Sequence, residues 1–235
     1  LSDLSIAKGF QNYVMSNSGL CILKDGILSD RFRDRIMFPI FNLSNKIIAF
    51  GGRVLVTEKA RAKYVNSPET ELYNKSKVLY GLNFAKKEII KQDRCFLVEG
   101  YTDVITLHQV GIENVVASSG TSLTADQIKL ICRYTKNITI LYDGDLAGIK
   151  ASFRGIDMIL SQGMNVSVVL FPNGEDPDSF AKSHKDTIKE YIANNTKNFI
   201  SFKTEVLLED TNNDPIKLSE LTESICETIA LIPDS

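Results

Sequence analysis

Four short apolar segments, separated by stretches of helical periodicity, constrain the fold of this chain more than any other feature. The segments are residues 95–98, 115–117, 138–142 and 166–171. Between the last two, apolar residues recur at spacings of three and four, which places one apolar stripe on an amphipathic helix: Ile149, Phe153, Ile156 and Leu160. Strands that alternate with helices are typical of a parallel sheet with helices on its faces. We therefore predict an α/β domain over residues 93–184.

The residues on either side of this domain follow other patterns. Two apolar runs, 36–40 and 47–55, flank a polar turn at 42–45, which predicts a β-hairpin or two adjacent strands. Pro39 indicates an edge position or an irregular strand, because proline donates no ladder hydrogen bond. We expect a mixed α+β subdomain over residues 1–92. Residues 185–235 have a helical pattern with a polar break at 210–215, which predicts a helical C-terminal segment.

Charge divides along the chain in the same way. Residues 1–92 carry 15 Lys and Arg against 8 Asp and Glu, a net charge of +7, whereas the remaining 143 residues carry 12 against 21, a net of −9. This asymmetry is consistent with a basic surface for a polyanion beside an acidic site for cations. Ordinary surface charge is the alternative interpretation.

Composition excludes several classes of protein. With 235 residues, 43% of them hydrophobic, the chain can bury a substantial core. The four cysteines are scattered, without a Cys-x-x-Cys pair, which argues against a zinc ribbon or a disulfide scaffold. No apolar run is long enough to span a bilayer, and Leu1 opens no apolar leader. We expect a cytoplasmic piece of a longer protein, with no membrane partner.

Acidic residues follow three of the four predicted strands. Glu99 and Asp103 follow the first, the Asp143-Gly-Asp145 sequence follows the third, and Glu175-Asp-Pro-Asp178 follows the fourth. Ligands of open parallel sheets gather beyond the carboxyl ends of the strands. Carboxylates that are forced together raise one another's pKa unless a cation neutralises them. Oxygen ligands suit Mg²⁺ or Mn²⁺ rather than zinc. Each motif alone is also a common turn or helix start.

Together, these strand ends resemble the Toprim fold, in which a glutamate after the first strand and an Asp-x-Asp after the third bind metal for phosphoryl transfer. Toprim domains occur in primases, topoisomerases, recombination mediators and nucleases, so this likeness leaves the reaction open.

The flanking segments resemble bacterial DnaG-type primases from about Phe32 to Phe180. The matching stretches include Arg33-Asp-Arg-Ile-Met-Phe-Pro-Ile40, Phe50-Gly-Gly-Arg-Val54, Lys63-Tyr-Val-Asn-Ser-Pro-Glu-Thr70, Leu79-Tyr-Gly-Leu82, Val98-Glu-Gly-Tyr-Thr-Asp103, Ala117-Ser-Ser-Gly-Thr121, Tyr142-Asp-Gly-Asp-Leu-Ala-Gly148 and Gly174-Glu-Asp-Pro-Asp178. The resemblance implies a primase core that makes short RNA primers on single-stranded DNA from ribonucleoside triphosphates, with a nucleoid or replisome location. The implied fold is a Toprim-type sheet with a basic subdomain before it and a helical segment after it.

The resemblance also implies a set of site residues. Glu99, Asp143 and Asp145 would be catalytic, within an acidic site for two or more Mg²⁺ or Mn²⁺ ions formed by Glu99, Asp103, Asp143, Asp145, Asp176 and Asp178. Nucleotides and nucleic acid would be bound by Arg33, Arg35, Arg53, Lys63, Asn66, Lys75 and Tyr101.

The chain differs from the family pattern at two single positions and in the modules that the resemblance implies around the core. Ser119 replaces a common leucine, which we expect to adjust loop packing, and Leu146 replaces a common arginine, which removes a positive charge near the metals. By the resemblance we expect this chain to be a piece without the zinc module, the start of the core and the domain that binds the replicative helicase, and we expect low activity of the piece alone. Another Toprim enzyme, a nuclease or topoisomerase, and a non-catalytic nucleic-acid-binding module remain the alternatives.

Overall fold

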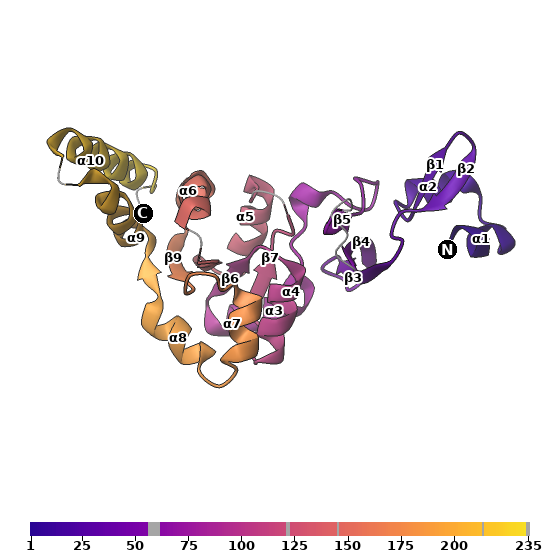
Figure 1. Cartoon of the computed structure of the whole chain (residues 1–235), viewed down its shortest axis with the longest axis horizontal. Helices are drawn as coiled ribbons and strands as arrows, with labels where there is room; N and C mark the ends of the chain where they lie inside the picture. Colours follow the sequence, from indigo (N-terminus) through magenta and orange to yellow (C-terminus); the bar gives the residue numbers. More distant parts are fainter. Residues whose placement is uncertain (56–61, 121–122, 145, 213, 234–235) are drawn as a thin grey trace. The chain divides into compact units, whose positions relative to one another are not determined.

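The computed structural model describes residues 1–55, 62–120, 123–144, 146–212 and 214–233. The chain forms two compact units, Leu1–Val78 and Leu79–Ser235, which Figure 1 traces in sequence colours. Helix α3 (Leu82–Gln92) therefore groups with the second unit. The domain boundaries expected at residues 92 and 184 stay predictions.

The first unit contains a small antiparallel sheet with the predicted hairpin. Its elements are α1 (Ser2–Ala7), α2 (Asn12–Asn17), β1 (Cys21–Lys24), β2 (Ile27–Asp30), β3 (Arg35–Phe41), β4 (Ile47–Val54), β5 (Tyr64–Asn66) and the 3₁₀ helix η1 (Lys75–Lys77). β1 and β2 pair with each other, and the other strands form a sheet in the order β3-β4-β5. β3 is an edge strand, with Pro39 opposite Phe50, as predicted.

The second unit contains the predicted parallel sheet. Its further elements are β6 (Cys95–Val98), α4 (Tyr101–Gln109), β7 (Val115–Ala117), α5 (Ala125–Cys132), β8 (Asn137–Tyr142), α6 (Leu146–Leu160), β9 (Asn165–Leu170), α7 (Pro177–Ser183), α8 (Ile188–Asn195), β10 (Lys197–Asn198), α9 (Phe199–Thr211) and α10 (Pro215–Ala230). The strand order is β10-β9-β8-β6-β7, and all pairs are parallel except β10 with β9. The four predicted strands are confirmed to within one residue.

The core of the second unit explains why these segments form the sheet. All four residues of β6 are buried, as expected for a central parallel strand that helices cover on both faces. The predicted stripe on α6 is buried along its length: Ile149, Phe153, Ile156 and Leu160. The expected polar break separates α9 from α10, whose first turn is capped by the Asp214 carboxylate. The short strand β10 was not expected in this helical segment.

None of the helices in the described ranges is both long and apolar enough to cross a bilayer.

Candidate active site

Acidic residues gather where the parallel strands end, at the carboxyl ends of β6, β8 and β9. This part of the sheet, with Glu99, Asp103, Asp143, Asp176 and Asp178, is called the acidic edge. β8 pairs with β6 on one side and with β9 on the other, and Tyr142 at the end of β8 lies opposite Leu170 at the end of β9. The chain leaves β6 at Glu99 and β8 at Asp143, and both of these residues are exposed. After β9, Asp176 occupies the N-cap of α7. The strand ends therefore bring together segments that lie far apart in the sequence.

Asp103 lies inside this edge, on the first turn of α4. It is 7% exposed, and its carboxylate accepts a hydrogen bond of 2.8 Å from the backbone N–H of Gly100. Burial, together with the smaller effect of the negative charges of Asp176, Asp143 and Asp178, raises the pKa of Asp103 to about 7, and the Gly100 N–H opposes this shift. The three other carboxylates thus lie close enough to Asp103 to repel its charge.

The loops that follow β8 and β9 are joined by their backbones. Gly144 donates its N–H to the carbonyl of Glu175 at 3.0 Å, and Phe171 donates to the carbonyl of Tyr142 at 3.1 Å. A Cβ at position 144 would collide with the carbonyl oxygen of Pro172 and lie 2.7 Å from the Cα of Asn173. Glycine is therefore required at the centre of the Asp-Gly-Asp sequence for this close approach.

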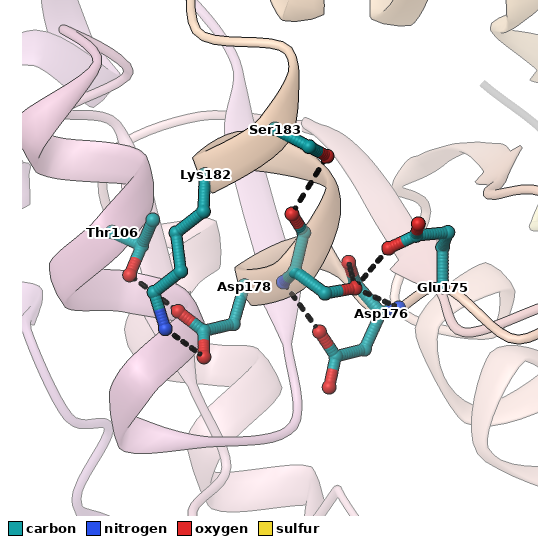
Figure 2. A network of polar contacts seen from close by, with 7 residues as sticks. Thr106, Glu175, Asp176, Asp178, Lys182 and Ser183 are labelled. Carbon is teal, nitrogen blue, oxygen red and sulfur yellow. Dashed lines mark hydrogen bonds and ion pairs between the residues drawn. The ribbon is translucent and has the colours of Figure 1, made fainter.

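The two aspartates of the last motif have different local roles (Figure 2). The Asp176 carboxylate accepts a 2.6 Å hydrogen bond from the backbone N–H of Ser179 and so caps α7. Asp178 is held from two sides: one oxygen accepts from the Thr106 hydroxyl at 2.5 Å, and the other pairs with the Lys182 ammonium at 2.7 Å. The Ser179 hydroxyl also donates to the Glu175 carboxylate.

This donor set fits a hard divalent cation. Its groups are all carboxylates, and a cation would neutralise the negative charges that, in addition to burial, raise the pKa of Asp103. Within the described residues, no three His, Cys, Asp or Glu side chains are grouped closely enough to hold a metal ion. Asp145, one of the predicted ligands, lies outside the described residues.

Arg53 and Asn66, two of the predicted nucleotide-binding residues, lie on one face of the small sheet in the first unit, and a third, Lys63, lies near the same aromatic ring as Arg53. Arg53 lies opposite Tyr64 in the register of β4 and β5, and Asn66 lies opposite Gly51 two positions along. The guanidinium carbon of Arg53 is 5.7 Å from the centroid of the Tyr64 ring, and the Lys63 ammonium is 6.0 Å from it. Arg53 and Lys63 thus lie near one aromatic ring, and Asn66 lies on the same face of the sheet as Arg53; these three residues form a cationic and polar cluster.

Arg35 and Tyr101, two more of the predicted binding residues, have other surroundings. Because Ile36 is the residue opposite Arg53, strand alternation puts Arg35 on the other face of the sheet. There its guanidinium donates to the carbonyls of Gly52 at 3.2 Å and Ala62 at 2.9 Å. Tyr101 is 2% exposed, and its ring packs against the ring of Tyr80, with 4.7 Å between the ring centroids.

Two further predicted residues lie apart from the cluster. Arg33 is exposed in the turn before β3. Lys75 begins η1, where its backbone N–H donates to the Glu69 carboxylate at 2.9 Å.

Thr106 and Lys182 contact a predicted ligand and were missed in the sequence. Lys182 follows Asp178 by four residues on α7, a spacing that pairs side chains on a helix, so the sequence does carry a signal for it. Thr106 precedes Asp178 by 72 residues and lies on another helix, so no local pattern could reveal this contact.

Comparison with known families defines the class of each half of the chain. Residues 96–181 match the Toprim-like family model, which agrees with the sheet and its acidic edge. Residues 1–86 match the model described as the DNA primase catalytic core, N-terminal domain. The combination is that of a primase core rather than of a Toprim nuclease or topoisomerase.

Individual relatives lead to the same family. DNA primases of Clostridium acetobutylicum and Staphylococcus aureus (strain COL) are 40% identical over 224 residues and 36% identical over 236 residues, which is 95% and 99% of this chain. A solved DNA primase domain from Pseudomonas aeruginosa is 35% identical, with a TM-score of 0.85, over 94% of this chain and 70% of that one. A DnaG primase catalytic domain bound to ssDNA is 34% identical, with a TM-score of 0.83, over 95% and 71%. This chain belongs to the DnaG-type DNA primase family. It spans only 37% and 39% of the length of the two curated relatives.

Proposed function

We propose that this chain is the catalytic core of an enzyme that synthesises short RNA primers on single-stranded DNA. The observation that carries the proposal is the group of carboxylates around Asp103, at the strand ends of a chain that belongs to the primase family. A relative described as bound to ssDNA supports a single-stranded template. Ribonucleoside triphosphates would be the substrates, and the replicative helicase would be a partner of the longer protein.

The acidic edge would bind the cations that the reaction needs. Glu99, Asp143 and Asp145 are the proposed catalytic ligands, and Asp103, Asp176 and Asp178 complete the set. Two or more Mg²⁺ or Mn²⁺ ions would supply charge neutralisation at the reacting phosphate and the leaving pyrophosphate. Asp103 would bind them with its proton released, because a nearby cation favours the charged carboxylate and so opposes the burial and repulsion that raise its pKa.

The first unit would bind the polyanions. Arg53 offers two parallel donors to a phosphate, whereas Lys63 acts as a point charge. Asn66 on the same face can donate or accept a hydrogen bond. We assign nucleotide or nucleic-acid binding to this cluster. Arg35 would act indirectly, by holding the backbone next to Lys63.

The test is incorporation of labelled ribonucleotides on single-stranded DNA with Mg²⁺ or Mn²⁺. We expect RNA from this chain, or from a longer chain with the rest of the protein, and loss of RNA in the Asp143→Ala/Asp145→Ala variant. Asp186→Ala/Glu190→Ala removes two exposed carboxylates elsewhere and should keep full activity. If neither wild-type chain makes RNA but DNA is cut or relaxed, the primase proposal is wrong and a nuclease or topoisomerase function replaces it.

A further inference from the structure

Asp178 is held by two groups with very different surroundings. The Thr106 hydroxyl is on a residue that is only 5% exposed, and it reaches Asp178 from α4, the helix that carries Asp103. Lys182 reaches the other carboxylate oxygen from the next turn of α7, with a side chain that is 60% exposed against 13% for Asp178. Figure 2 shows the two partners on the same side chain.

We propose that Thr106 and Lys182 are positioning residues with opposite effects on cation binding at the acidic edge: Thr106 holds Asp178 in place for the cation, and Lys182 competes with the cation for Asp178. This inference rests on the proposed function, because it takes Asp178 as one of the cation ligands. It goes further because it names two residues that change the affinity of the site for cations without contacting a nucleotide.

The effect of Thr106 follows from its burial and its place on α4. Its hydrogen bond ties α7 to α4 and so sets the position of Asp178 relative to Asp103. Without the hydroxyl, a largely buried carboxylate oxygen would lack its donor and the side chain would be free to rotate. Groups that orient metal ligands in this way typically change metal affinity by about ten- to a hundredfold when they are removed.

The effect of Lys182 follows from its charge and exposure. Because the Lys182 side chain is 60% exposed, its ammonium can move from Asp178 into solvent at little cost when a divalent cation arrives. Until then it partly neutralises the carboxylate and repels an incoming cation. Both effects lower the affinity of the acidic edge for cations.

The experiment measures Mn²⁺ binding by the electron paramagnetic resonance signal of free Mn²⁺, without nucleotide or DNA. We expect Lys182→Gln to tighten binding about two- to fivefold at low salt, and less at about 0.5 M salt because the charge is then screened. Thr106→Val should weaken binding about tenfold at either salt concentration, and Thr106→Ser should restore it because the hydroxyl returns.

Two variants serve as matched controls. Lys185→Gln removes an exposed lysine three residues further on. Thr135→Val removes a buried hydroxyl that also donates to an aspartate, Asp93, at 2.7 Å, away from the strand ends of the acidic edge. Neither should change Mn²⁺ affinity, although Thr135→Val should lower the stability of the fold.

The outcomes separate this inference from the proposed function. If Asp143→Asn weakens Mn²⁺ binding but Lys182→Gln and Thr106→Val leave it unchanged, the inference is wrong and the cation site stands. If the wild-type protein binds no Mn²⁺, or if Asp143→Asn has no effect, both fail together. Should Thr106→Val not fold, Lys182→Gln and Thr106→Ser still decide the matter, because tighter binding in the first and unchanged binding in the second are required.

Discussion

At the scale of single residues, ionisation of Asp103 lowers the stability of the folded protein. Its carboxyl is buried and faces the charges of Asp143, Asp176 and Asp178, so its pKa of about 7 lies well above the ordinary value of 3.8 for an aspartate. A carboxyl whose pKa is raised on folding stabilises the protein below the unfolded pKa, and this stability is lost as the pH rises through the folded pKa. The relevant window is therefore roughly pH 4 to 7.

We predict that Asp103→Asn is more stable than the wild-type protein at pH 8 without divalent cations. The amide keeps an acceptor for the Gly100 N–H and carries no charge, so the gain should be about 2 kcal/mol or more at pH 8 and should vanish near pH 4. Urea denaturation at both pH values measures it. Mg²⁺ should stabilise the wild-type protein more than the variant. A variant that is less stable than the wild type at pH 8 would contradict this account of the charge.

At the scale of elements, the loops after β8 and β9 act as one unit. The hydrogen bond from Gly144 to Glu175 and the approach of Gly144 to Pro172 and Asn173 join the Asp-Gly-Asp sequence to the loop that leads to Asp176. The carboxylates from two strands are therefore positioned by backbone contacts as well as by the sheet.

We predict that Gly144→Ala destabilises the fold by at least about 2 kcal/mol, because the new methyl group meets backbone atoms that cannot rotate away. It should also weaken Mn²⁺ binding, since the two loops must separate. Gly155→Ala, in the interior of α6 with open space around it, is the matched control and should stabilise by about 0.5–1 kcal/mol. Thermal and urea unfolding followed by circular dichroism compare the two. Equal stability of both variants would show that the loops are not packed as described.

At the scale of the whole molecule, the opposite charges of the two parts of the chain match two kinds of ligand. The basic N-terminal part contains the cluster of Arg53, Lys63 and Asn66, and the acidic remainder contains the strand-end carboxylates. Binding of single-stranded DNA by the basic part should depend strongly on salt, because each neutralised phosphate releases counterions.

We predict that Arg53→Gln and Lys63→Gln each reduce the slope of log affinity against log salt by about 0.7, the value for one phosphate contact on a single strand. Lys24→Gln, which removes an exposed lysine on β1, should leave the slope unchanged. Fluorescence anisotropy of a labelled oligonucleotide over a salt series measures all three. If Lys24→Gln changes the slope as much as the others, binding follows total charge and not this cluster.

Much of the fold was readable from the sequence, because strands and helices reflect local periodicity. The buried strands of the second unit, the stripe on α6 and the edge position of Pro39 each depend on a few consecutive residues. The acidic residues could also be named in advance, because the order of strands and acidic residues along the chain implied a common sheet edge.

Tertiary structure alone decided which side chains from distant segments meet and how the polar residues predicted for the site are placed. It paired Thr106 with Asp178, brought Gly144 against Pro172, turned Arg35 toward main-chain carbonyls and buried Tyr101. These contacts join segments that are far apart in the sequence, or depend on which face of a strand or helix the fold covers. Local patterns therefore determined the elements and the type of chemistry, whereas packing between distant segments determined how each residue can take part in it.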